Sequence, residues 1–556
     1  MCCGDWLMNN VFVKGLFFFL LLFGSFLKAS ENPNATLDPS KENISVEEQK
    51  RFGGVLVFAR GADGSSMDPA LVTDGESYVA TGNIYDTLVQ FKYGTTEVEP
   101  ALATSWEISP DGLVYTFHLR KGVYFHQTKY WNKKVEFSAK DVLFSFERQM
   151  DKAKRYYSPG AKSYKYWEGM GMSHIIKSIE ALDDYTIRFT LNGPEAPFLA
   201  NLGMDFLSIL SKDYADYLAQ NNKKDELAKK PVGTGPFKFF LWNKDEKIIL
   251  VKNQDYWGPK AYLDKVVVRT IPNSSTRALA LRTGEIMLMT GPNLNEVEQL
   301  EKLPNIVVDR SPGLIANWLS LNTQKKYFNN PLVRLAINHA INVDDYIKVI
   351  YEGFAQKMVN PFPPTIWGYN YNIKPYEYDL KKAKELLKQA GYPNGFKTTI
   401  FTTSTRNPKG AVFIQASLAK IGIDVKIEVY EWGAYLKRTG LGEHEMAFAG
   451  WMADIADPDN FLYTLWSKQA ASAIPTQNGS FYKSDAFSDL LIKAKRVSDQ
   501  KEREALYLKA QEIIHKDAPY VPLAYPYSVV PHLSKVKGYK TTGVSVNRFF
   551  KVYLEK

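Results

Sequence analysis

Cysteine is almost absent from this sequence: the only two, Cys2 and Cys3, precede the first apolar segment. No thiol follows that segment to form a disulfide or to carry a lipid. Common enzyme motifs are missing as well, since no G-x-S-x-G elbow, Walker loop or H-E-x-x-H sequence occurs. The seven histidines are scattered, so a zinc site has no support. We therefore expect no enzymatic activity, no metal and no cofactor.

A long block of one charge sign is also missing. The 69 basic and 60 acidic residues are interleaved, and the net charge of +9 is spread over 556 residues. This pattern excludes nucleic acid as an expected partner. Hydrophobic residues make up 45% of the chain, enough for a large core and for two or three domains.

The first long apolar run, Gly15–Leu27, is typical of a signal peptide. It is shorter than the ~20 residues that a membrane span requires, and Lys14 precedes it. We expect residues 1–29 to be cleaved, with translation starting at Met1 or Met8. No second run of ~18 apolar residues follows, so we expect a periplasmic protein without stable membrane insertion.

The rest of the chain reads as an α/β protein behind a flexible leader at residues 30–53, which is rich in Asn, Pro, Ser and Glu. Val55–Phe58 is typical of a buried strand, and Tyr115–Leu119 alternates as a half-exposed strand. Asp379–Ala390 has helical spacing, with Asp379 placed as the N-cap and Gly391 just beyond the end. Strands and helices alternate throughout, which predicts sheets covered on both faces.

Two other patterns are interpreted as structural. Gly169 and Gly171, like Gly233 and Gly235, lack the third glycine of a dinucleotide site, and turns explain them. Asp457 and Asp459, two residues apart beside Pro and Asn, indicate a turn and a cap rather than an acid/base pair.

Long segments of the chain resemble the family of extracellular solute-binding proteins that serve peptide and nickel importers, and most of all the dipeptide-binding proteins of Gram-negative bacteria. The resemblance runs from about Gly54 to the C-terminus. The segments that carry it are Gly94–His126, Pro194–Leu199, Met204–Lys212, Val232–Phe237, Tyr256–Gly258, Trp367–Asn370 and Gly450–Phe461.

The resemblance implies a two-lobe hinged periplasmic binding protein fold, of the large peptide-binding subtype with an extra subdomain. Lobe I would comprise residues 54–312, with the subdomain at about 100–230, and residues 526–556 would return to it. Lobe II would comprise residues 313–525. Pro312-Gly313 is the expected first crossing, and the return would fall near Ala524–Tyr527.

In this family a peptide pairs through its backbone, which gives affinity without side-chain selectivity. The resemblance implies that Asp454 holds the peptide ammonium and that Trp451 lines the pocket. Main chain at Gly450 and Met452 would pair with the ligand. Main chain at Gly75 and Glu76 would contribute from the opposing lobe.

The residue that meets the peptide carboxylate stays open between Arg406 and Lys409, because the segment before the next helix is shorter than in the family. Lysine supplies a point charge rather than a bidentate fork, so the limit on peptide length stays open as well.

The expected partners are therefore a short peptide and the transmembrane subunits of an ABC permease, with the protein itself a monomer. A nickel-chelate or haem receptor of the same family is the first alternative, for which His444 is the one suggestive histidine. A surface adhesin or chaperone-like protein is the second, supported only by the 14% aromatic content.

Overall fold

The computed structural model describes residues 46–151, 153, 164–404, 408–453, 455–497, 499–540 and 547–556. The chain divides into two units, residues 1–43 and 44–556. The first unit, which contains the expected signal peptide, lies outside the described residues. At the start of the second, helix α1 (Val46–Gln49) lies in the expected leader, where the Tyr262 hydroxyl donates to Glu48 at 2.8 Å.

The second unit is organised around one large mixed sheet. In sheet order its strands are β16 (Asp424–Tyr430), β15 (Lys397–Thr403), β17 (Met446–Met452), β13 (Ile315–Leu321), β18 (Tyr520–Leu533), β11 (Leu288–Met289), β1 (Val55–Arg60), β10 (Lys265–Thr270), β9 (Lys247–Lys252) and β8 (Phe237–Asn243). Two more strands, β12 (Ile306–Pro312) and β14 (Ala355–Lys357), pair with β18. The buried strand predicted at Val55–Phe58 is confirmed as the start of β1.

A separate four-stranded antiparallel sheet has the order β4 (Ala103–Ile108), β5 (Val114–Leu119), β7 (Thr186–Leu191) and β6 (Ile176–Asp183). Side chains along β5 alternate between half-buried and buried, which confirms the strand predicted there. The remaining short strands are β2 (Val89–Phe91), β3 (Val98–Pro100), β19 (Val536–Lys537) and β20 (Tyr553–Leu554).

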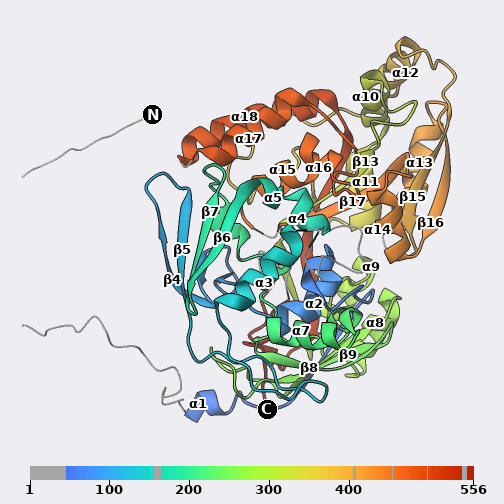
Figure 1. Ribbon diagram of the computed structural model, residues 1–556. Helices are drawn as coiled ribbons and strands as arrows, with labels where there is room; N and C mark the ends of the chain where they lie inside the picture. Colours follow the sequence, from blue (N-terminus) through green and yellow to red (C-terminus); the bar gives the residue numbers. More distant parts are fainter. Residues whose placement is uncertain are drawn as a thin grey trace, which may run out of the picture. The chain divides into compact units, whose positions relative to one another are not determined.

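Helices surround these sheets (Figure 1). They are α2 (Gly75–Ile84), α3 (Ala139–Met150), α4 (Lys165–Gly169), α5 (Met172–Ile175), α6 (Phe198–Asn201), α7 (Lys212–Gln220), α8 (Ser274–Arg282), α9 (Leu294–Glu301), α10 (Pro331–Ala340), α11 (Val343–Tyr351), α12 (Leu380–Gln389), α13 (Pro408–Ala419), α14 (Trp432–Gly440), α15 (Asp459–Trp466), α16 (Lys468–Ser472), α17 (Asp485–Arg496) and α18 (Gln500–Asp517). The described residues also form the short 3-10 helices η2 (Pro69–Leu71), η3 (Asp205–Leu207) and η4 (Lys224–Ala228).

Helix α12 has the cap and the apolar face that the spacing of residues 379–390 predicts. The Asp379 carboxylate accepts a hydrogen bond from the Lys382 backbone N–H at 2.9 Å, which caps the helix. Ala383 and Leu387, four residues apart, are buried on one face. Gly391 follows with φ +90°, a conformation that suits glycine at a helix end. The predicted helix and its N-cap are confirmed, and Gly391 follows directly after the C-cap, Ala390.

Two segments connect the halves of the large sheet. Strand β12 ends at Pro312 and β13 begins at Ile315, while β18 pairs with β13 over its first residues and with β12 over its last. Pro312 lies opposite Tyr527 in the ladder, so the two connections run side by side. A Cβ on Gly313 would lie 2.7 Å from the Pro526 carbonyl oxygen, which explains glycine at this close approach.

The buried apolar side chains form two main cores. The smaller one draws only on residues between Leu319 and Phe448 and on Val521–Ala524. The larger one contains nearly all the buried apolar residues before Trp318 and those after Val530, most of those between Trp451 and Ile514, and also Met358, Phe362 and Ile366. Each half of the large sheet thus has a core of its own, and the segment after Trp451 packs on the larger one.

Candidate ligand-binding site

The first half of the candidate site is the start of helix α2. The Asp74 carboxylate caps it, accepting hydrogen bonds from the Ser77 backbone N–H at 3.1 Å and from the Ser77 hydroxyl at 3.0 Å. Gly75 is exposed and Glu76 is half-buried. The first N–H groups of a helix have no partner within that helix, so Gly75 lies where backbone donors point outward.

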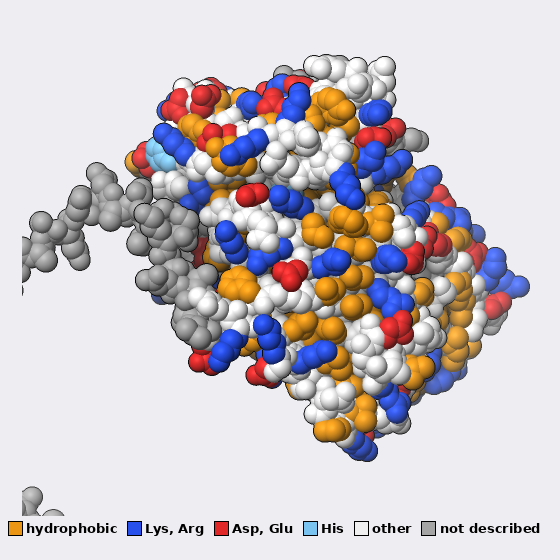
Figure 2. All heavy atoms as spheres, turned by 90° about the horizontal axis from the view of Figure 1, so that it is seen from below, with side chains coloured by type: hydrophobic (Ala, Val, Ile, Leu, Met, Phe, Trp, Pro, Cys, Tyr) orange, Lys and Arg blue, Asp and Glu red, His pale blue; other side chains and the backbone are white. Residues whose placement is uncertain are grey.

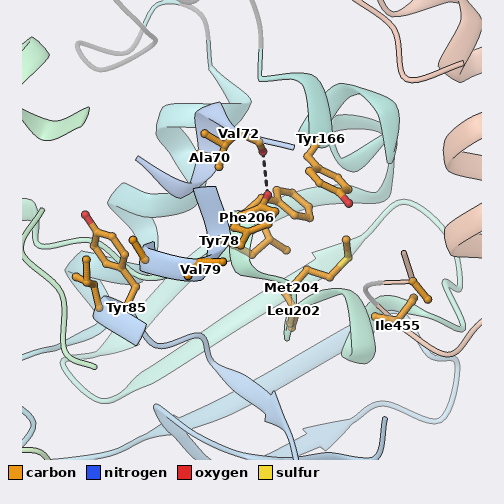
Figure 3. Close-up of a cluster of buried hydrophobic side chains, with 14 of the residues drawn as sticks. Ala70, Val72, Tyr78, Val79, Tyr85, Tyr166, Leu202, Met204, Phe206 and Ile455 are labelled. Carbon is orange, nitrogen blue, oxygen red and sulfur yellow. Dashed lines mark hydrogen bonds between the residues drawn. The ribbon is translucent and has the colours of Figure 1, made fainter. Parts of the chain in front are cut away.

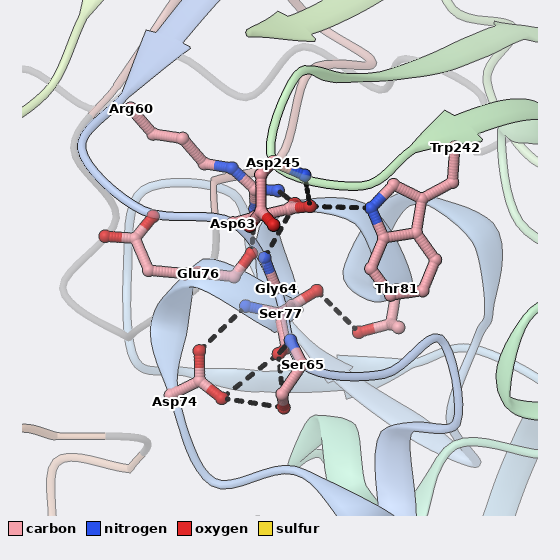
Figure 4. A network of polar contacts seen from close by, with 10 residues as sticks. All are labelled: Arg60, Asp63, Gly64, Ser65, Asp74, Glu76, Ser77, Thr81, Trp242 and Asp245. Carbon is pink, nitrogen blue, oxygen red and sulfur yellow. Dashed lines mark hydrogen bonds and ion pairs between the residues drawn. The ribbon is translucent and has the colours of Figure 1, made fainter. Parts of the chain in front are cut away.

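A buried ion pair fixes the loop that leads into this helix (Figure 4). The Asp63 carboxylate pairs with the Arg60 guanidinium, and the two side chains are 3% and 0% exposed. Asp63 also accepts from the Trp242 indole N–H at 2.8 Å and from the Asp245 backbone N–H at 2.7 Å. Arg60 in turn donates to the Glu76 carbonyl. Because the buried charges are paired and hydrogen-bonded, they hold the start of α2 in one position.

The second half is the carboxyl end of strand β17. Its first residues, Met446 and Ala447, pair with β15 on one side and with β13 on the other. Over Phe448–Met452, β13 is the only pairing strand that the described residues provide. One edge of this stretch is therefore open. The Tyr435 hydroxyl of α14 reaches this edge and donates to the Phe448 carbonyl.

Two backbone positions face the open edge. N–H and C=O groups of successive strand residues point to opposite sides. The Ala453 N–H donates to the Leu314 carbonyl on the β13 side, at 2.9 Å, whereas the Phe448 carbonyl points toward α14. Gly450 and Met452 therefore direct their backbone groups to the open edge. This edge can accept one more extended chain.

Aromatic rings pack between the two halves. The Trp451 ring centroid lies 5.6 Å from that of Tyr166, which stacks on Phe206 at 4.9 Å. Figure 3 shows Tyr166 and Phe206 near Tyr78 of α2, in a buried cluster that includes Ile455 from just beyond β17. The end of β17 and helix α2 thus belong to one packed region.

Three buried charged groups, which we call the charge triad, also join distant segments. The Lys495 ammonium of α17 lies 2.9 Å from the Glu195 carboxylate and 3.6 Å from that of Asp459. The three side chains are 5%, 7% and 0% exposed. Burial raises the pKa of Glu195 to about 7 and that of Asp459 to about 6, even though the ammonium opposes this. When both carboxylates are ionised, one buried negative charge is left over.

Asp457 and Asp459 form the turn that their spacing predicts, since the Asp459 N–H donates to the Asp457 carboxylate at 3.0 Å. The two side chains then take different cations. Asp457 pairs with Arg503 at 2.9 Å, and Asp459 faces Lys495. No local sequence pattern predicts these ion pairs.

His444 does not line an accessible site. Its side chain is fully buried and its Nε2 lies 2.6 Å from the Gly479 carbonyl oxygen. Burial lowers the pKa of His444 to about 4, so the ring is neutral at pH 7. No three His, Cys, Asp or Glu side chains within the described part of the chain are grouped so as to hold a metal ion.

Residues 97–473 match the family model of bacterial extracellular solute-binding proteins, family 5. The chain belongs to this family. Over 507 residues it is 40% identical to the dipeptide-binding protein of Escherichia coli K12, covering 90% of this chain and 94% of that protein. Over 523 residues it is 39% identical to heme-binding protein A of Haemophilus influenzae, covering 93% and 95%.

A solved structure is similar over nearly the whole described chain. It is an ABC transporter-associated periplasmic binding protein from Helicobacter pylori, in complex with the peptide STSA. The identity is 98%, the TM-score is 0.91, and the match covers 92% of this chain and 100% of that one. The two-lobe α/β fold expected for this solute-binding protein is confirmed. None of its described helices has the length and apolar character of a membrane span.

Only some of the site residues that the family resemblance predicts lie within the described residues. Gly450, Trp451 and Met452 lie on the open-edged end of β17, and Gly75 and Glu76 start α2. Asp454 and Arg406 lie outside the described residues, and Lys409 is exposed on the first turn of α13. The residues that flank Asp454 are buried, Ala453 at 0% and Ile455 at 1% exposed.

Sequence reasoning missed the aromatic residues that other elements bring to the site. Tyr166 and Phe206, which pack with Trp451, come from far upstream in the chain. The aromatic run Tyr164–Trp167 was the one signal available, because clustered large rings often mark a ligand-facing surface.

Proposed function

We propose that this protein captures short peptides with free termini in the cleft between its lobes and delivers them to an ABC importer. The observation that carries the proposal is the open edge of β17. There Gly450 and Met452 present backbone N–H and C=O groups, to which an extended peptide can add as a further strand. Such pairing uses hydrogen bonds to the peptide backbone and not to its side chains, so it suits a receptor for peptides of many sequences.

Charge then selects the free amino terminus. We assign Asp454 to the peptide ammonium, as the family resemblance implies. Arg406 and Lys409 remain the family-based assignments for the peptide carboxylate.

The protein acts outside the cytoplasmic membrane, after cleavage of residues 1–29, as a monomer that binds without chemical turnover. Lobe I would comprise residues 54–312 with the return at 526–556, and lobe II residues 313–525. The paired connections at Pro312 and Tyr527 would form the hinge, since a few backbone angles there can absorb the lobe rotation.

The test is calorimetric titration of the mature protein with the peptide Ser-Thr-Ser-Ala and with its N-acetylated form. Asp454→Ala should weaken binding of the free peptide by ~2–5 kcal/mol, roughly 30-fold to several-thousand-fold. Acetylation should weaken wild type similarly and barely affect the variant, because both changes remove one interaction. Asp424→Ala, at an exposed aspartate of β16, is the matched control.

The same calorimetric titration, extended to haemin and Ni(II)–histidine, separates the peptide receptor from the haem and nickel receptors. In small-angle scattering, added peptide should reduce the radius of gyration as the lobes close. The peptide should be recovered intact, since we propose no turnover. A protein that ignores peptides but binds haemin or Ni(II)–histidine would contradict the proposal. Haemin belongs in the panel because one relative at 39% identity carries the name heme-binding protein A.

A further inference from the structure

Lys165, at the start of α4, is a cation without a direct partner. No hydrogen bond or ion pair links its ammonium to another residue in the described ranges, although the side chain is half-buried. Burial lowers its pKa, and the nearby Asp74 carboxylate only partly opposes this. A half-buried ammonium usually has a carboxylate or several carbonyls around it. Lys165 has no such partner among the described residues, which indicates that its counter-charge comes from elsewhere.

The position of Lys165 connects both halves of the candidate site. Asp74, which lies close enough to favour the charged lysine, caps α2. On the other side, the Lys165 Nζ lies 3.5 Å from the place where a Cβ on Gly440 would be. Gly440 is the last residue of α14, the helix whose Tyr435 hydroxyl reaches the open edge of β17. Next to Lys165, Tyr166 contacts Trp451.

Asp74 is poorly suited to be the missing partner. Its carboxylate already accepts hydrogen bonds from the Ser77 N–H and hydroxyl, and the Ser65 hydroxyl lies at 3.5 Å (Figure 4). The Asp74 charge favours the protonated lysine, but the two side chains form no ion pair. A second carboxylate could therefore approach the ammonium without displacing a bond that Lys165 already makes.

We propose that Lys165 is a specificity-determining residue that receives a carboxylate of the bound peptide. The inference rests on the proposed function and deepens it. Lys409 is the contrasting cation: it is exposed on the first turn of α13, where water screens its charge. Lys165, shielded between α2 and α14, attracts an anion more strongly because less solvent screens the pair.

The carboxylate could be the peptide's C-terminus or an acidic side chain, and two peptide series distinguish these sources. The first compares free Ser-Thr-Ser-Ala with its C-terminal amide. The second compares Ser-Thr-Asp-Ala with Ser-Thr-Asn-Ala. Calorimetry on the mature protein measures both series for wild type, Lys165→Met and Lys165→Arg. The matched control is Lys177→Met, at an exposed lysine of β6.

For wild type and Lys177→Met, we expect neutralising the recognised carboxylate to weaken binding about 10- to 100-fold, as for a charge-assisted hydrogen bond. Lys165→Met should lose this preference and bind both members of that pair equally. Lys165→Arg should keep part of it, which a purely structural lysine would not require. N-acetylation should still weaken Lys165→Met fully, because the ammonium contact is separate.

The inference is overturned if Lys165→Met keeps the full preference in both series, which would make Lys165 an interlobe contact at the end of α14 only. It is also overturned if wild type binds the charged and the neutral peptide of each series with equal affinity. These results leave the proposed function standing as long as acetylation weakens binding. If wild type binds no peptide at all, the proposed function itself fails. Circular dichroism and melting of each variant show that a lost preference does not come from misfolding.

Discussion

The replacement Lys495→Met tests how much the buried ion pairs of the charge triad contribute to the stability of the fold. The substitution keeps most of the side-chain volume but leaves Glu195 and Asp459, at 7% and 0% exposure, without their shared ammonium. Removing one partner of a buried charge pair typically costs ~3–5 kcal/mol. We expect a loss of unfolding free energy of that size at pH 7.5.

A control lies two positions away on the same helix. Lys493 pairs with Glu502 at 3.9 Å, and the two side chains are 63% and 53% exposed. Water screens such a pair, so Lys493→Met should cost ~1 kcal/mol or less. Urea unfolding followed by tryptophan fluorescence measures both variants. Equal midpoints for the two would refute the reasoning, because burial would then have no effect.

The pH dependence gives the triad a second signature. Glu195 and Asp459 have pKa values raised to about 7 and about 6, so the folded state takes up protons that the unfolded state releases. Their contribution to stability is full below about pH 4 and is lost as the pH rises through those values. In Lys495→Met both carboxylates can become neutral at pH 5. The difference between variant and wild type should therefore be smaller at pH 5 than at pH 7.5.

Two further predictions concern a close contact on β17 and two buried histidines. Gly450→Ala should destabilise the protein by ~1–3 kcal/mol in urea, because the new Cβ would lie 2.2 Å from the Asn317 Oδ1; an unchanged midpoint would contradict the close packing. His126 and His444, with pKa values lowered by burial to about 3 and about 4, should remain neutral at pH 5 in an NMR titration. Each then removes roughly 2 kcal/mol of stability as the pH falls from 6.5 to 5, and titration near pH 6.5 would contradict this.

The elements that could be predicted are those determined by near neighbours in sequence. Helix α12 needs only Asp379, an apolar stripe and Gly391, all within one short segment. Strand β5 needs only the alternation of Val114–Leu119. Pro312-Gly313 is predicted as the first crossing because two residues that interrupt regular structure lie between a helical segment, Asn295–Leu303, and the apolar run Leu314–Leu321. That it joins two lobes stays a prediction.

The candidate site could be predicted only in part, because its contacts join segments that are far apart in the chain. The resemblance identified the end of β17 and the start of α2. Nothing local indicates that Tyr166 would contact Trp451, or that Lys495 would be buried against Glu195. Such pairs depend on how the large sheet and its helices pack, and periodicity carries no information about packing between distant segments.

Figure 2 shows how charged side chains are distributed over one face of the protein. Lys and Arg side chains there are spread among acidic, apolar and other side chains and do not form one block. This distribution fits the interleaved charges of the sequence.

The shared carboxylate of Asp63 has a consequence for the entropy of binding. It holds Arg60, Trp242 and the Asp245 backbone in fixed positions, so the loop before α2 has little conformational freedom left to lose. Each long side chain that needs no ordering spares about 0.5–1.5 kcal/mol on association. If peptide binds beside α2 as proposed, its conformational cost would fall on the ligand and on lobe closure, because the loop before α2 is already ordered by these contacts.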